Sequence, residues 1–199
     1  MSLESWRERP RRVLDDPAAM RAFAHPVRLA LHELLMRAGA TTAADAAREV
    51  GVSQALASYH LRQLARYGFV EQAEARDERE RPWKATSLTQ DWSDAGADPE
   101  ASAARGLLEQ VIAERALARL AEWQERRADE PDAWRKAGGI GNSYLYVTPD
   151  ELDALDDAVS RLLEPLMARI ADPSERPEGA RPVLLTTLTI PLRTTGTGD

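Results

Sequence analysis

The sequence predicts a mainly helical α+β protein, and three observations favour that class. Residues 43–66 contain two short stretches with apolar residues at helical spacing, separated by Gly51. The segments 69–75 and 83–88 have the length and composition of two paired strands. Residues 98–127 form a long run with a broad apolar face. At 199 residues and 43% hydrophobic composition, the chain is an ordinary globular protein that can bury a core.

Capping residues set the starts of the N-terminal helices. Asp16, Thr42 and Ser53 each offer a side-chain oxygen to the first turn of the helix that follows. Gly51 stands where a helix end needs a left-handed residue. The helices expected here are 17–24, 26–37, 43–50 and 54–66. With the strand pair that follows, they predict a winged helix-turn-helix.

The second half of the chain is expected to hold a long helix and a smaller extension. The helix at 98–127 has a wide apolar stripe and no neighbouring partner in sequence, which is typical of a helix that packs against a second copy. Thr148 and Glu151 form a capping box for a further helix, which Pro165 should kink or divide. Strands are expected at 144–147 and 183–190, paired with each other.

These elements divide the chain into five parts. The expected parts are a flexible N-terminal arm at 1–14, a winged helix-turn-helix domain at 15–92, a long dimerisation helix at 98–127, a small α/β extension of strand, helix and strand at 140–192, and a disordered tail at 193–199.

The helix at 54–66 has the pattern of a DNA-reading element. Steps of 100° place Leu56, Ala57, His60, Leu61 and Leu64 toward the core. The same steps place Ala55, Ser58, Tyr59, Arg62 and Arg66 on the outside. No acidic residue lies between 53 and 68. An apolar back with an arginine-bearing front suits a helix in the major groove of double-stranded DNA.

Charge distribution is compatible with that partner. The chain carries a net charge of −7, but residues 20–90 hold ten Lys or Arg against eight Asp or Glu. Attraction to phosphates would therefore be local and sensitive to salt. Gln54 in the first turn can pair with adenine. Ser58 and Tyr59 could reach base edges or phosphates, and Arg62 and Arg66 would more readily reach phosphates. The wing arginines, Arg79 and Arg81, are either further DNA contacts or part of a solvated turn, because acidic residues lie among them.

Three stretches of sequence carry a family resemblance. Residues 24–35 (AHPVRLALHELL), 53–71 (SQALASYHLRQLARYGFVE) and 81–89 (RPWKATSLT) resemble the arsenic-repressor-like (ArsR/SmtB) family of bacterial transcription factors. The resemblance covers about residues 15–90. Segments 143–159 and 179–192 look like the C-terminal extension of a long-chain subgroup.

The resemblance implies a homodimer on an imperfect inverted repeat, generally a repressor released by an effector. It also implies phosphate contacts by Thr42 and Ser53, with simple capping as the alternative role for both. Metal sensors of the family use cysteines, or paired histidines and carboxylates on the last helix. This chain has no Cys, and its three histidines precede that helix, so we expect no metal site.

Other function classes are disfavoured by what the sequence lacks. No apolar run approaches the roughly 20 residues of a membrane helix, and the first residues are not a signal peptide, so a cytoplasmic protein is expected. The sequence has no nucleophile–base pair that would indicate an enzyme and no loop motif that would indicate a cofactor. Trp123 and Trp134 are candidates for an effector pocket, or for packing alone. The alternative function is a protein-interaction module in which Tyr59 and Arg62 contact a partner protein.

Overall fold

The N-terminal half of the computed structural model is a helical domain with a small hairpin; the structure describes residues 12–74, 81–87, 90–91 and 98–193. Its helices are α2 (Pro17–Phe23), α3 (Pro26–Ala38), α4 (Ala43–Val50) and α5 (Gln54–Arg66), and its hairpin strands are β2 (Val70–Gln72) and β3 (Trp83–Ala85). The two strands are antiparallel, with Glu71 opposite Lys84. The predicted α+β class and the winged helix-turn-helix are confirmed.

The expected caps account for where these helices begin. Asp16 accepts from the Ala18 N–H at 2.8 Å, and Thr42 and Ser53 accept at 3.2 Å from N–H groups three residues on. Gly51 ends α4 with φ 74° and ψ 35°, the left-handed conformation in which glycine has no Cβ penalty. One further cap was not expected from the sequence. The imidazole Nδ1 of His25 accepts from the Val27 N–H at 3.2 Å, at the start of α3.

The core of this domain is formed where α2, α3, α5 and the hairpin meet. Phe69 is fully buried, and its ring stacks on that of Phe23 with centroids 4.3 Å apart. His32 meets Phe23 edge-on at 5.0 Å. Leu31, Leu35, Leu61, Leu64 and Leu108 are among the fully buried side chains. Each buried Leu or Phe contributes about 1.5–3 kcal/mol of burial free energy, so this cluster fixes α5 against the scaffold.

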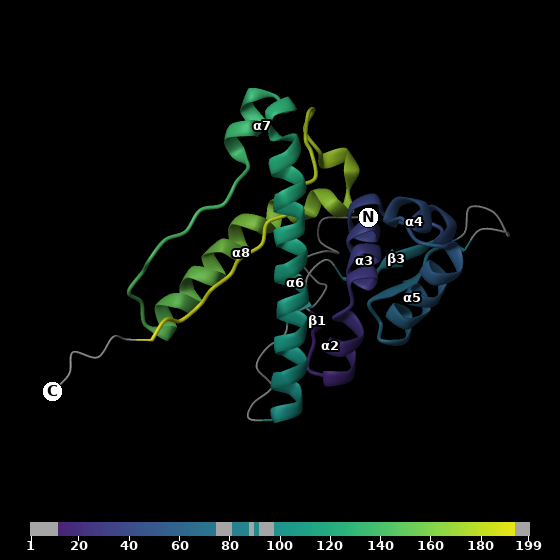
Figure 1. The fold of residues 1–199 in the computed structure, drawn as a ribbon, viewed down its shortest axis with the longest axis horizontal. Coiled ribbons are helices and arrows are strands. Elements are labelled where there is room, and N and C mark those ends of the chain that lie inside the picture. The colour runs from purple at the N-terminus through teal and green to yellow at the C-terminus, as the bar shows by residue number, and fades with distance from the viewer. Residues whose placement is uncertain (1–11, 75–80, 88–89, 92–97, 194–199) are drawn as a thin grey trace.

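The long helix α6 (Pro99–Arg126) lies along the domain and shares its core (Figure 1). Ala104 and Leu108 are buried in the core cluster of the domain, and α2 makes the most extensive contact with α6. Two ion pairs also join α6 to the domain: Glu100 pairs with Arg21 on α2, and Arg115 pairs with Glu33 on α3. The winged domain and α6 are therefore one packed unit.

The chain turns at the end of α6 through a 3-10 turn (Arg127–Asp129) and a short helix, α7 (Asp132–Ala137), which the sequence analysis did not predict. A second long helix, α8 (Pro149–Ala171), then begins at the expected capping box and is followed by a 3-10 turn (Pro173–Glu175). Pro165 lies inside α8 without dividing it.

The strands predicted in the extension were wrong for a single chain. Neither 144–147 nor 183–190 is assigned as a strand, and the segments run on either side of α8 in Figure 1. Because α8 separates them, they form no ladder with each other.

The expected N-terminal arm also ends earlier than predicted. Strand β1 (Arg12–Val13) pairs in parallel with β4 (Gln90–Asp91), and Leu14 is 2% exposed within the core. The remainder of the arm, residues 1–11, and the tail residues 194–199 lie outside the described residues. Among the described residues, no helix combines the length and apolarity needed to span a membrane.

Candidate nucleic-acid interface

The outer face of α5 is open along its length. Tyr59 is 49% exposed, and the other exposed positions at this face are Ser53, Gln54, Ala55, Arg62 and Arg66. Ser58 is half-buried at the edge of the face. Ala57, His60, Leu61 and Leu64 are buried on the opposite side, as the helical spacing predicts. We refer to Ser53, Gln54, Ala55, Ser58, Tyr59, Arg62 and Arg66 as the α5 face.

One assignment on this helix was wrong. Leu56 was expected toward the core and is 40% exposed instead. It lies in the first turn of α5, and the core in contact with this helix begins one residue later, at Ala57. Leu56 therefore adds an apolar side chain next to the α5 face.

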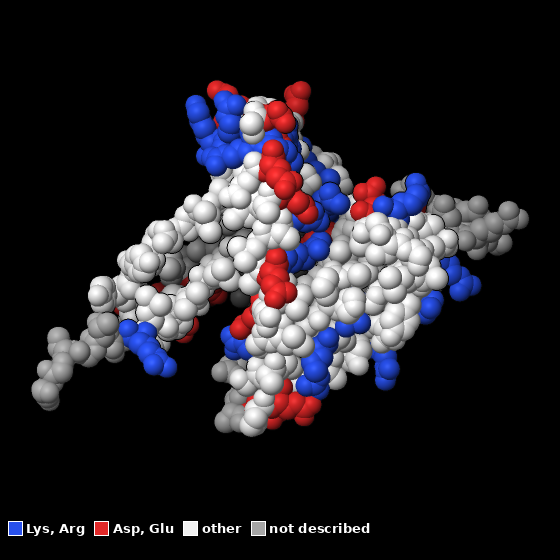
Figure 2. Space-filling view, in the orientation of Figure 1, with Lys and Arg blue, Asp and Glu red and all other residues white. Residues whose placement is uncertain are grey.

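The start of α5 provides hydrogen-bond donors at this surface. Ser53 accepts the Leu56 N–H through its Oγ, and the hydroxyl proton is then available to an acceptor outside the protein. The N-terminal end of a helix also carries a partial positive charge that favours anions. Figure 2 shows blue side chains, and no red ones, along the edge of the molecule at α5.

Thr42 differs from Ser53 in its surroundings. Its hydroxyl donates to the Asp45 Oδ2 at 2.7 Å and accepts from the Asp45 N–H, and Asp45 pairs in turn with Arg48. This geometry accounts for Thr42 as a cap. A phosphate placed at the Thr42 hydroxyl would meet the Asp45 carboxylate.

A histidine pair supports α5 from beneath. His60 is 5% exposed, and its ring lies 4.6 Å from that of His25 and 5.2 Å from that of Tyr59. Burial, followed by the nearby His25 and Arg28, lowers the pKa of His60. Burial and then Arg28 lower the pKa of His25. Both imidazoles are therefore neutral near pH 7 and act as packing groups, and the described residues contain no cluster of His, Asp and Glu that could hold a metal.

The wing contributes less to the surface described here. Lys84 on β3 pairs with Glu71 on β2 at 3.2 Å, which offsets its charge. Arg81 is exposed two residues before β3, whereas Arg76 and Arg79 lie outside the described residues.

The two candidate pocket tryptophans lie near the α6–α7 turn but have different environments. Trp123 lines an open cavity of about 480 Å³ with Leu120, Gln124, Arg127 and Lys136, and the glycine-rich segment after α7 forms one of its walls. Gly138 lies directly against the Trp123 ring, which Arg126 covers at 4.9 Å. Trp134 does not line this cavity and instead lies under the Arg181 guanidinium at 5.1 Å.

A second cavity, of about 500 Å³, lies between α3, α4 and α6. The sequence analysis missed it because its walls come from three separate helices. Charged side chains dominate its lining, including the Glu33–Arg115 pair.

Comparisons with known proteins add a domain assignment. A family model described as a helix-turn-helix domain matches residues 23–73. No curated protein matches the sequence. Among solved structures, the chain is similar to a point mutant of ZitR from Lactococcus lactis, with 18% identity, a TM-score of 0.30, and coverage of 65% of this chain and 73% of that chain. The matched residues run from the end of α2 to just past β2 and include the whole α5 face, so this chain contains a helix-turn-helix domain at residues 23–73.

Proposed function

We propose that this protein is a cytoplasmic, sequence-specific DNA-binding regulator of transcription that acts without catalysis. The observation that carries the proposal is the α5 face, an exposed helix surface with two arginines and no acidic residue. It belongs to a helix-turn-helix domain, in which the second helix of the pair commonly enters the major groove.

Each position on the face has a role that suits its place. Gln54 lies exposed in the first turn, where its amide can pair with adenine. Ser53 presents a hydroxyl at the helix start, and Arg62 and Arg66 lie about two and three turns beyond Gln54, where phosphates are the nearer groups. The buried His60, Leu61 and Leu64 hold the helix rigidly against the domain.

A homodimer supplies the second DNA contact in this proposal. The face of α6 turned away from the core has small and uncharged residues, namely Ala103, Gly106, Gln110, Ala113 and Leu117, and Leu117 is 61% exposed. Two such faces can pack without like-charge repulsion. Two-fold symmetry then places the α5 helices at half-sites about one helical turn, roughly 34 Å, apart.

A dimer bound over a promoter would act as a repressor, and the cavity beside Trp123 is the candidate site for a small-molecule effector.

Titration of fluorescent duplexes with the full-length protein tests the DNA contact. Arg62→Ala should weaken binding to matched and scrambled sites alike and lower the salt slope by about one unit. Gln54→Ala should cost about 1–3 kcal/mol on the matched site and little on the scrambled one. Arg119→Ala is the control, because this exposed arginine pairs with Glu122 on α6, away from α5.

The alternative is a protein partner at the same surface. The exposed Leu56 and Tyr59 favour it, since apolar and aromatic side chains anchor protein interfaces. Unchanged duplex binding in both α5 variants, or no duplex binding by the parent protein, would support this alternative over DNA.

A further inference from the structure

The two extended segments that flank α8 leave their apolar side chains uncovered. Tyr144, Leu145 and Tyr146 in the first segment are each 61% or more exposed. In the second segment, Val183, Leu184, Leu185, Leu188, Ile190 and Leu192 are 55–71% exposed. We call residues 139–147 and 181–192 the arm segments.

The backbone of the arm segments is also unpaired. Among the described residues, neither arm segment makes a backbone–backbone hydrogen bond. Residues 183–190 are rich in leucine and β-branched residues, a composition that favours strands. Each arm segment therefore presents a free strand edge, which is a template for pairing with another chain.

The uncovered area is large enough for a specific interface. Nine side chains at roughly 100 Å² each amount to roughly 900 Å² of apolar surface per chain. The largest apolar patch of a typical monomer is about 300–600 Å². A standard interface buries about 800 Å² on each partner, and the two arm segments together offer an apolar area of that order on the two sides of α8.

We propose that the arm segments pair with the arm segments of a second copy of this chain, forming an intermolecular sheet over the two α8 helices. The segments from 137 to 148 and from 182 to 192 have no charged residue, so two copies meet without repulsion. Figure 2 shows the projecting part of the molecule largely white, with a hollow between it and the lower half of α6.

Charge argues against a membrane as the occupant. Helix α8 carries six acidic residues and two arginines, and the arm segments themselves supply only Arg181. An anionic lipid surface would repel this region, because interfacial segments rely on Lys and Arg beside their apolar face. A second copy needs no such charge. The inference does not depend on DNA binding, which is measured separately.

Amide hydrogen exchange of the full-length protein tests the pairing. Exchange is measured at a series of protein concentrations, and sedimentation gives the fraction of dimer at each one. Amides at 183–190 should exchange about 100-fold slower in the dimer than in the monomer, because hydrogen bonds form only between copies. Equal protection in the monomer would show pairing within one chain. Fast exchange in the dimer would show that α6 alone holds it. A protein that stays monomeric at every concentration would show that no second copy binds. Each of these three results overturns the proposal.

Matched aspartate substitutions give a second readout. Leu188→Asp should raise the dimer dissociation constant at least about tenfold, since it places a charge in the apolar face of the sheet. Thr189→Asp places the same charge on the next residue, which lies on the opposite face of the strand and is already polar. It should raise the dimer dissociation constant less than Leu188→Asp does. Both residues are exposed in the single chain, so its folding is retained. Equal effects of the two changes, or no effect of Leu188→Asp, would overturn the proposal.

Discussion

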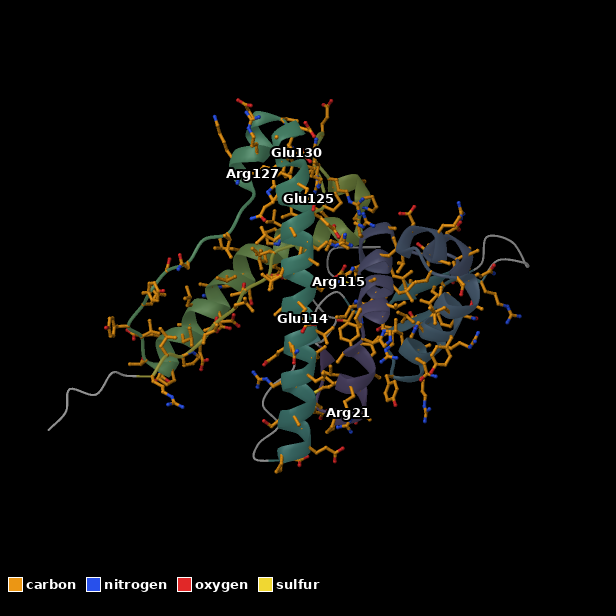
Figure 3. The ribbon with its side chains drawn as sticks, in the orientation of Figure 1. Arg21, Glu114, Arg115, Glu125, Arg127 and Glu130 are labelled. Carbon is orange, nitrogen blue, oxygen red and sulfur yellow. The ribbon has the colours of Figure 1, made fainter. Side chains whose placement is uncertain are left out.

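The ion pair between Arg115 and Glu33 joins α6 to the winged domain, and its removal should loosen that junction. The guanidinium reaches from α6 toward α3 (Figure 3) and donates from Nε to Oε1 and from a terminal nitrogen to Oε2, both at 2.5 Å. The Arg115 side chain is 19% exposed and that of Glu33 is 38% exposed. The burial of this ion pair is therefore intermediate between that of a fully solvated pair and that of a fully buried pair.

Its coupling energy follows from that position. Exposed pairs contribute about 0.2–1 kcal/mol, and truncation of one partner in a buried pair costs about 3–5 kcal/mol. A two-pronged arginine–carboxylate pair at intermediate burial should then couple by about 1–2 kcal/mol. Arg119 and Glu122 form the matched control, because they are 48% and 58% exposed on the same helix. Their coupling should be about 0.5 kcal/mol or less.

Two double-mutant cycles measure these energies. One cycle combines Glu33→Ala with Arg115→Ala, and the other combines Arg119→Ala with Glu122→Ala. The free energy of unfolding in urea is measured at one fixed protein concentration, since dimerisation would alter apparent stability. Equal coupling in the two cycles would refute the reasoning that burial and two-pronged geometry strengthen the Arg115 pair.

Three further predictions concern pH and two glycines. Burial lowers the pKa of His25 and His60 below the unfolded value of 6.5, so as pH falls below about 6.5 the unfolded chain binds protons first and stability is lost. His25→Asn keeps a capping acceptor without titrating there, and the slope of unfolding free energy against pH should decrease. Gly51→Ala should cost about 1 kcal/mol because φ is 74°, and Gly51→Asn should cost less; urea unfolding that shows no loss for alanine would contradict this. Gly138→Ala would place a Cβ 2.9 Å from the Trp123 ring and should lower the thermal midpoint, whereas Gly139→Ala has open space and should not.

The local signals in the sequence were sufficient for the helices and their caps. Ser53, Thr42 and Thr148 act within one turn, so their roles can be read from neighbouring residues. The periodicity of α5 also predicted its buried and exposed sides, apart from Leu56. That residue was misplaced because its exposure depends on where the core ends, which is a property of the packed domain.

The errors arose where structure depends on distant partners. A strand pattern at 183–190 does not specify which edge it pairs with, and within one chain α8 keeps it apart from 144–147. The N-terminal arm was expected to be flexible up to residue 14, although Leu14 and the β1–β4 pairing bring its end into the core. His25 was missed as a cap because imidazole is an uncommon capping group, and the charged cavity on α6 arises from three helices that the sequence does not place together.

Selection of binding sites from a random duplex library by the full-length protein tests the DNA-reading role of the α5 face most directly. The account predicts enrichment of a two-fold symmetric sequence with half-sites about one helical turn apart, and a relaxed preference at one base pair of each half-site in Gln54→Ala but not in Arg119→Ala. Recovery of no sequence above background by the parent protein would contradict it.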